Sequence, residues 1–461
     1  MFIDQASNPV PIIPLTESSL ENWLETAAED RKRWVRASGF RARPGTSLLM
    51  PDGDGELACV LSGHVPEERL WSLAHLPGVL PKGEYRLQSG WSAEEEARAA
   101  LGWGLGGYRF DRYRKLEHPE ARLVLPEGRE REVRILFEAA TQVRNLVNTP
   151  AIDLGPSDLA DEARDLAREF GGKCRVIEGR KLAEEFPAVH VVGQASSRPP
   201  CMIRMEWGRR EDPVLALVGK GVIFDSGGLN IKPGAGMVTM KKDMGGAAHV
   251  LGLARMIMAL GLKVQLRVYI PAVENAIAGN AYRPSDIIRT RNGTSVEIGN
   301  TDAEGRVILS DALSWACEEG AERIIDFATL TGAARVALGE DLPPIYGRDG
   351  AAVRAIQESA FREEDPLWHM PLYKPYKQQI QPPLADISNT GTTPMGGSVL
   401  AALFLDHFVA AEVDWYHLDV FAWNLNDRPG RPKGGEAQGL RAIWAWLCEQ
   451  YGRSGDGGEK T

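Results

Sequence analysis

Two short segments of this sequence combine charged residues and glycines densely enough to suggest chemistry. Segment 218–247 reads VGKGVIFDSGGLNIKPGAGMVTMKKDMGGA, and segment 299–313 reads GNTDAEGRVILSDAL. Their candidate functional residues are Lys220, Asp225, Lys232, Asp243, Asp302, Glu304 and Arg306. Carboxylates and lysines without histidine or cysteine form a site of hard ligands, which favours divalent cations. Two adjacent cations would explain how so many acids could converge without prohibitive repulsion.

Taken alone, each of these residues has a simpler structural explanation. An aspartate before two glycines is typical of a turn, and acids at the start of a helix stabilise the helix dipole. Lys220 and Lys232 could be solvated surface charges. Functional residues do gather at the carboxyl ends of strands in open α/β sheets, and Asp225 closes the apolar run 222–224. The spacing makes a site plausible but does not identify a reaction.

The elements that must position these residues alternate along the chain. Continuous apolar runs predict buried strands at 214–218, 222–224, 264–273 and 324–328. Asn300, Thr301 or Asp302 is expected to cap the helix that follows. Such a cap places Asp302, Glu304 and Arg306 in or near the first turn of that helix. The alternation predicts an α/β catalytic domain with a central mixed β-sheet flanked by helices.

The length of the chain predicts more than one domain. At 461 residues it exceeds what one hydrophobic core usually holds. Segment 132–148 has its apolar residues on one helical face, and Pro150 bars an easy continuation. We predict a smaller N-terminal α/β domain over 1–130, a connecting helix over 131–150 and a catalytic domain over 151–461.

Composition argues against several classes of protein. The 53 Lys+Arg and 63 Asp+Glu give a formal net charge of -10, which disfavours attraction to nucleic acid or anionic membranes. A membrane span is not expected, because no apolar run reaches about 18 residues. The N-terminus lacks a basic region ahead of an apolar stretch and does not resemble a signal peptide. The five cysteines are scattered without a CxxC pair, which indicates reduced thiols in a cytoplasm.

Longer motifs in the same segments resemble one enzyme family. NTDAEGR at 300–306 is the signature core of the leucyl aminopeptidase (cytosol aminopeptidase) family. The resemblance extends through VGKGVIFDSGGLNIKPGAGM, MKKDMGGAA, GNAYRPSDI and DFATLTGA, and it covers roughly residues 143–440. These motifs are long and collinear. The resemblance implies a two-metal aminopeptidase that hydrolyses the N-terminal residue from peptide substrates.

The resemblance also implies a role for each candidate residue. The metal ligands of the family match Lys220, Asp225, Asp243, Asp302 and Glu304. They would hold two divalent ions per subunit, Mn²⁺ or Zn²⁺, with Asp225 and Glu304 as bridging ligands. Lys232 would polarise the scissile carbonyl and stabilise the oxyanion, while Arg306 would hold a bicarbonate that acts as general base. The family assembles as a dimer of trimers, so a homohexamer is implied here.

The pocket for the substrate is where this sequence departs from the family pattern. The substrate-binding positions match Met240, Asn300, Thr329, Gly332 and Phe421. Lys242 stands in MKKDM where the family usually has Tyr, and Phe421 stands in HLDVFA where HLDIAG has Ala. A phenylalanine that points into the pocket would disfavour bulky Leu or Phe relative to Ala or Gly. If the ring turns into the core behind the sheet instead, the pocket would prefer Leu.

Two other functions compete with the aminopeptidase. A two-metal phosphoesterase would use similar carboxylates but would not predict the collinear signature. A non-catalytic or moonlighting protein, structural or DNA-binding, could use the same scaffold. Loss of a metal ligand would favour that alternative, and all five matching residues are intact in the sequence.

Overall fold

The computed structural model describes residues 1–452 and divides the chain into two compact units. Unit 1 is Met1–Thr141 together with Asn426–Lys433, and unit 2 is Gln142–Leu425 together with the chain from Gly434 onward. The long helix α4 (Glu130–Asn148) runs across the division. Within the described residues, every helix is too short or too polar to cross a membrane.

Unit 1 contains a mixed sheet with the strand order β1-β6-β5-β2-β4-β3 among the described residues. Its pairs are parallel except for β3 with β4. The strands are β1 (Phe2–Ile3), β2 (Val10–Leu15), β3 (Ser47–Pro51), β4 (Leu57–Gly63), β5 (Gly83–Leu87) and β6 (Ala121–Val124). The helices are α1 (Glu17–Thr26), α2 (Glu29–Ser38), η1 (Leu76–Gly78) and α3 (Ala93–Gly107). This unit is the smaller N-terminal α/β domain that the sequence predicts.

Unit 2 is built on a larger mixed sheet. Its strand order is β16-β15-β18-β14-β9-β11-β8-β7, and β10 also pairs with β11. The strands are β7 (Lys173–Glu178), β8 (Cys201–Trp207), β9 (Val214–Gly219), β10 (Gly221–Asp225), β11 (Gln265–Asn275), β14 (Arg323–Ala328), β15 (Pro344–Gly347), β16 (Trp368–His369) and β18 (Asp414–Asp419). Short strands outside it are β12 (Ile287–Arg289), β13 (Ser295–Glu297), β17 (Ile387–Ser388), β19 (Trp423–Asn424) and β20 (Gly434–Gly435).

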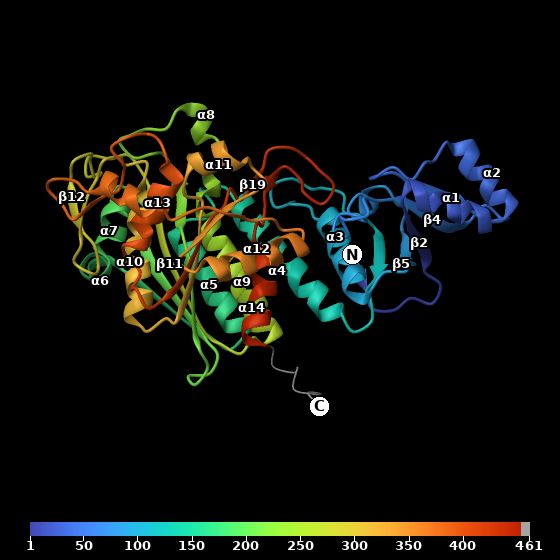
Figure 1. Cartoon of the computed structure of the whole chain (residues 1–461), viewed down its shortest axis with the longest axis horizontal. Coiled ribbons are helices and arrows are strands. Elements are labelled where there is room, and N and C mark those ends of the chain that lie inside the picture. The colour runs from blue at the N-terminus through green and yellow to red at the C-terminus, as the bar shows by residue number, and fades with distance from the viewer. Residues whose placement is uncertain (453–461) are drawn as a thin grey trace. The chain divides into compact units, whose positions relative to one another are not determined.

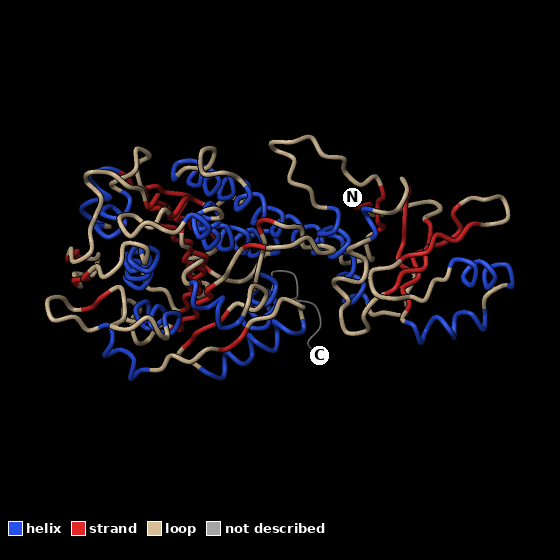
Figure 2. The backbone as a smooth tube through the Cα atoms, turned by 90° about the horizontal axis from the view of Figure 1, so that it is seen from above, coloured by secondary structure: helices blue, strands red, loops and turns tan. Residues whose placement is uncertain are grey.

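Helices cover both faces of this sheet, as Figures 1 and 2 show. On one face α10 packs with Ile324 and Ala328 of β14; on the other, His249 of α9 stacks on Phe327. The helices of unit 2 are α5 (Pro156–Glu169), α6 (Gly179–Glu185), α7 (Pro187–Gly193), α8 (Gly234–Met237), η2 (Met240–Met244), α9 (Gly245–Leu260), α10 (Glu304–Glu318), α11 (Gly332–Leu338), α12 (Gly350–Arg362), η3 (Lys374–Ile380), α13 (Gly397–Asp406) and α14 (Leu440–Tyr451). The predicted fold class, a mixed sheet flanked by helices, is confirmed.

The apolar character of the central strands follows from this double cover. Residues 215–218 of β9 are fully buried, because helices exclude water from both faces of the sheet. Strands β9, β10, β11, β14 and β18 are joined by parallel pairs, so their carboxyl ends lie at one edge. The polar residues that follow these strands are therefore brought together at that edge.

Candidate active site

The ends of three neighbouring strands supply the first part of the site. Lys220 follows β9, Asp225 ends β10 and Asn275 ends β11, where it is paired in register with Asp225. Gly227 and Gly228 follow with φ of 88° and 62°, a backbone region that favours glycine. The chain turns there and returns toward the strand ends with Lys232.

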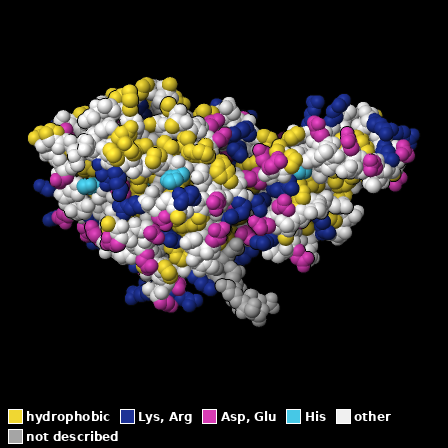
Figure 3. Space-filling view, in the orientation of Figure 1, with side chains coloured by type: hydrophobic (Ala, Val, Ile, Leu, Met, Phe, Trp, Pro, Cys, Tyr) yellow, Lys and Arg dark blue, Asp and Glu magenta, His cyan; other side chains and the backbone are white. Residues whose placement is uncertain are grey.

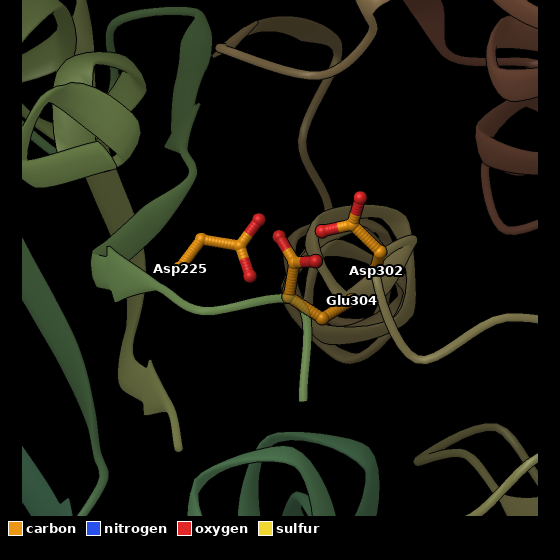
Figure 4. Close-up of side chains that lie close together, drawn as sticks. All are labelled: Asp225, Asp302 and Glu304. Carbon is orange, nitrogen blue, oxygen red and sulfur yellow. The ribbon is translucent and has the colours of Figure 1, made fainter. Parts of the chain in front are cut away.

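Three carboxylates converge at this edge. Oxygens of Asp225, Asp302 and Glu304 lie within 4.8 Å of one another. Figure 4 shows them pointing toward one another, Asp225 from the strand end and the other two from the start of α10. Asp243, from the η2 turn, joins them through a shared lysine. Lys220 Nζ lies 2.7 Å from Asp243 Oδ2 and 3.0 Å from Glu304 Oε1.

Lys220 is held firmly in this position. Its side chain is 3 % exposed, and its Nζ also donates to the carbonyl oxygen of Thr329 at 2.9 Å. Helix α10 can approach so closely only because it has Gly305 in its first turn. A Cβ atom on Gly305 would lie 2.4 Å from Cε of Lys220, which is far inside van der Waals contact.

Lys232 bridges the other two acids. Its Nζ lies 2.8 Å from Asp225 Oδ2 and 2.5 Å from Asp302 Oδ1. The side chain is 15 % exposed, so its ammonium group can be reached from solvent. Burial is the largest single influence and lowers the pKa of Lys232, but the surrounding acids, led by Asp225, together outweigh it and raise the pKa above its ordinary value. Lys232 is therefore a charged donor at neutral pH.

The two lysines neutralise the carboxylates of this cluster only in part. Burial, and then the charge of Asp243, raises the pKa of Asp225 to about 6. Burial, and then the charge of Asp225, raises the pKa of Glu304 to about 7, and burial also raises that of Asp302. Four carboxylates facing two ammonium groups leave an excess of two negative charges. Divalent cations fit such a set of donors and would keep its acids ionised.

The start of α10 differs from the sequence prediction. The residue that precedes the helix is Ala303, without a side-chain cap, so Asn300, Thr301 and Asp302 do not cap it. Their side chains are used elsewhere. Thr301 Oγ1 donates to the carbonyl of Gly227 at 2.6 Å, and Asn300 Oδ1 accepts from the Asp302 amide at 2.7 Å. The expected cap is wrong because the site competes for the same polar groups.

Two asparagines that the sequence analysis missed organise the site. Asn275 Nδ2 donates to Asp225 Oδ1 at 2.8 Å and to the carbonyl of Thr301 at 2.9 Å. Asn389 Oδ1 accepts from the amides of Gly299 and Asn300, and its Nδ2 donates back to the carbonyl of Asn300. Asn275 lies just beyond the predicted strand 264–273, a position where functional residues are expected. Asn389 lies in a loop without any comparable signal.

Arg306 lies in the first turn of α10 and is buried. Its Nη1 donates to the carbonyl of Asn389 at 2.8 Å. Its Nε is buried without a partner among residues 1–452. Burial lowers the pKa of Arg306 to about 10, which leaves the guanidinium charged at neutral pH. The site thus contains a charged guanidinium whose Nε could donate a hydrogen bond to an oxyanion.

The predicted substrate-binding residues lie on the segments around this cluster. Thr329 Oγ1 donates to Asp243 Oδ1 at 2.8 Å, and Met240 begins the η2 turn that carries Asp243. Gly332 begins α11, just beyond the end of β14. Phe421 follows β18 and is half-buried, with its amide donating to Gln438 Oε1 at 3.0 Å.

Two models of known protein families match this chain. The model of the cytosol aminopeptidase family, catalytic domain, matches residues 141–444. The chain belongs to the cytosol aminopeptidase family. A second model, the M17 aminopeptidase N-terminal domain, matches residues 10–126. The resemblance found in the motifs is confirmed, and this family member is a metallo-aminopeptidase, a hydrolase.

Individual relatives of this cytosol aminopeptidase are similar over most of the chain. A probable cytosol aminopeptidase of Aquifex aeolicus (strain VF5) is 42 % identical over 358 residues, covering 75 % of this chain and 72 % of the relative. The crystal structure of a cytosol aminopeptidase from Coxiella burnetii is 47 % identical with a TM-score of 0.95, covering 97 % and 98 % of the two chains. The bottromycin maturation enzyme BotP in complex with Mn is 32 % identical with a TM-score of 0.87, covering 96 % and 100 %.

Proposed function

We propose that this family member is a two-metal aminopeptidase that removes the N-terminal residue from peptides. The observation that carries this proposal is the convergence of four carboxylates around two lysines with an excess of negative charge. The residues that converge are those that match the ligand and catalytic positions of the family. Activity should therefore depend on divalent cations.

The donors suit Mn²⁺ or Zn²⁺. Asp225, Asp243, Asp302 and Glu304 would hold two ions through their oxygens, with Lys220 as an amine ligand. Lys220 must lose a proton to bind a cation, and a cation among the same carboxylates would favour that loss. When bound, such ions polarise a carbonyl group and lower the pKa of an attacking water.

Lys232 is proposed to stabilise the oxyanion that develops on the scissile carbonyl. Its ammonium is fixed between Asp225 and Asp302, so little reorganisation is needed when the negative charge appears. Its partial exposure lets a substrate approach. Asn275 supports this geometry, because its Nδ2 donates to Asp225 Oδ1 while Lys232 contacts Oδ2 of the same carboxylate.

Arg306 is proposed to hold a bicarbonate ion that accepts the proton of the attacking water. The support is a charged guanidinium whose Nε lacks a partner within the described chain. Asn389 fixes the guanidinium through Nη1 and also fixes the preceding loop through Asn300. The bicarbonate would thus be positioned by the loop around Asn300, which also carries Asp302.

Met240, Asn300, Thr329, Gly332 and Phe421 are proposed to bind the substrate. Their segments are closely packed. A Cβ atom on Gly245 would meet Ala422 Cβ at 2.6 Å and Thr329 Cγ2 at 2.9 Å. The ring of Phe421 lies near Lys242 and Arg335, on the side of η2 and α11. This placement favours the hypothesis that Phe421 narrows the pocket.

A homohexamer in the cytoplasm is proposed from the family resemblance. Exposed apolar side chains gather over the face that carries α8 and α11 (Figure 3). Val238, next to α8, is 78 % exposed, and Val336 of α11 is 90 % exposed. Apolar surface of this kind is typical of contacts between protein chains. The described cysteines are free thiols, as expected for a reducing compartment.

The test is hydrolysis of aminoacyl-anilides by the full chain before and after treatment with a chelator. We expect the treated protein to be inactive and Mn²⁺ or Zn²⁺ to restore activity. Glu304→Gln should lower kcat by several orders of magnitude, because water activation depends on the metal site. Glu318→Gln, at the exposed far end of the same helix, is the matched control and should retain activity.

Full activity in exhaustively demetallated protein would refute the two-metal proposal. Hydrolysis of phosphate esters in place of the anilides would favour the phosphoesterase alternative. The relatives described above are named as enzymes, so the non-catalytic or DNA-binding alternative gains no support from them.

A further inference from the structure

Two basic side chains lie beside the ring of Phe421. Lys242, in the η2 turn, is 1 % exposed, and its Nζ lies 5.0 Å from the centroid of the ring. Arg335, on α11, places its Cζ 4.8 Å from the same centroid. These residues come from three separate segments of unit 2. Their convergence on one ring is a tertiary feature of this chain.

Neither of these side chains has a carboxylate partner among the described residues. Within residues 1–452, no carboxylate oxygen lies within 4.0 Å of Lys242 Nζ or of the Arg335 guanidinium. Arg335 donates instead to a backbone carbonyl, that of Thr331, at 2.9 Å. Lys220 and Lys232, by contrast, each touch two carboxylates. Arg335 is thus a half-buried guanidinium without a carboxylate counter-ion in the described chain, so an anion that reaches it would be bound favourably.

The nearby acids are already engaged by other donors. Asp419 Oδ1 accepts from the amides of Leu330 and Thr331, and its Oδ2 accepts from Thr331 Oγ1 at 2.6 Å. Asp243 is paired with Lys220. The chain therefore leaves the donors around Phe421 available for a group that comes from outside.

These donors border the pocket proposed for the first side chain of the substrate. Met240 and Lys242 belong to the same short turn, and Gly332 and Arg335 to the same short helix. A Cβ atom on Gly332 would lie 3.7 Å from Arg335 Nη2. Phe421 supplies an apolar surface between the turn and the helix. The pocket wall thus combines an apolar ring with donors at its sides.

We propose that this pocket selects an acidic N-terminal residue, glutamate or aspartate, over the neutral residue of the same size. The ring of Phe421 would contact the methylene groups, while Arg335 and Lys242 would donate to the carboxylate. Arginine suits this role because its planar guanidinium can bind a carboxylate through two hydrogen bonds. The guanidinium of Arg335 would repel an N-terminal lysine or arginine. This inference rests on the aminopeptidase activity proposed above and specifies its substrate class.

The test compares substrates that differ only in charge. For the Mn²⁺-loaded enzyme, kcat/KM is measured with Glu- and Gln-anilides, with Asp- and Asn-anilides, and with the Leu-anilide. We expect Glu over Gln by roughly tenfold or more, since hydrogen bonds to charged groups are stronger than neutral ones. Arg335→Leu and Lys242→Met should each lower that ratio toward one. The matched controls Arg354→Leu, exposed on α12, and Lys241→Met should leave it unchanged.

The outcomes separate this inference from the proposed function. A Glu/Gln ratio of one or less in the wild type would overturn acidic selectivity while leaving the aminopeptidase intact, and this result requires no variant to fold. Failure to cleave every anilide, the Leu-anilide included, would instead defeat the proposed function. A ratio lowered equally by the controls would show a general charge effect and would overturn the roles of Lys242 and Arg335.

Discussion

Replacement of Lys232 by methionine separates oxyanion stabilisation from metal binding. The change removes the charge and the donor but keeps a side chain of similar length. In the structure, Nζ contacts Asp225 and Asp302, and it is one of two lysine ammonium groups that form ion pairs with the four carboxylates among the described residues. Loss of one oxyanion donor typically lowers kcat by about 10²–10³-fold, or roughly 3–4 kcal/mol. The negative excess in the site would rise from two charges to three, so Mn²⁺ should bind at least as tightly.

The assay measures kcat for an Ala-anilide across a Mn²⁺ titration, with Mn²⁺ affinity measured separately by calorimetry. We expect a large loss of kcat at saturating Mn²⁺ with no loss of affinity. Lys241→Met makes the same change of charge at a lysine whose Nζ donates to the Asn148 carbonyl, and it should retain most of the activity. A Lys232→Met enzyme with kcat within about threefold of wild type would refute the oxyanion role. Recovery of full activity by excess Mn²⁺ would assign the residue to metal binding instead.

Three further predictions concern specificity, stability and assembly. Phe421→Ala should raise kcat/KM for Leu-anilide relative to Ala-anilide by roughly 10–200-fold, and a wild type that prefers Leu, unchanged by the substitution, would contradict a narrowed pocket. Asp326→Ala should cost about 3–5 kcal/mol in urea unfolding, because it leaves buried His417 without the carboxylate 2.6 Å from its Nδ1; a loss under about 1 kcal/mol would argue against this. Burial opposes the charge of His417, but Asp326 raises its pKa, so this stabilisation is full below about pH 6.5 and is lost as the pH rises through the raised value. Light scattering should give six times the 50.5 kDa chain mass, and a mass near 50.5 kDa at micromolar concentration would exclude the hexamer.

Much of the fold could be predicted because its signals are local. The apolar runs at 214–218 and 324–328 lie within strands β9 and β14, and residues 132–148 lie within α4. Each of these segments is covered on a defined face, so its apolar residues repeat with the period of its own backbone. The order of the strands in the sheet has no such local pattern in the sequence, because it depends on which segments pack side by side in the folded unit.

The site itself was only partly accessible from the sequence. Asp225, Asp302 and Glu304 could be assigned because they lie in long collinear motifs. The cap before Glu304 was wrong because Thr301 hydrogen-bonds to Gly227, which is 74 residues away in the chain. A local rule for helix starts contains no information about such a distant competitor.

The sequence by itself determined the chemical class of this protein: hard ligands at defined spacings, an α/β pattern and motifs of one family. These properties reside in contiguous residues, and contiguous residues can be compared directly. Only the tertiary structure decided which side chains support the proposed ligands and what surrounds the proposed substrate pocket. Asn275 reaches Asp225 through the pairing of β10 with β11, and Lys242 meets Arg335 at Phe421 through the packing of three segments. Such neighbours are selected by the burial and hydrogen bonding of the whole unit, because an element's own residues fix its local conformation but not its partners.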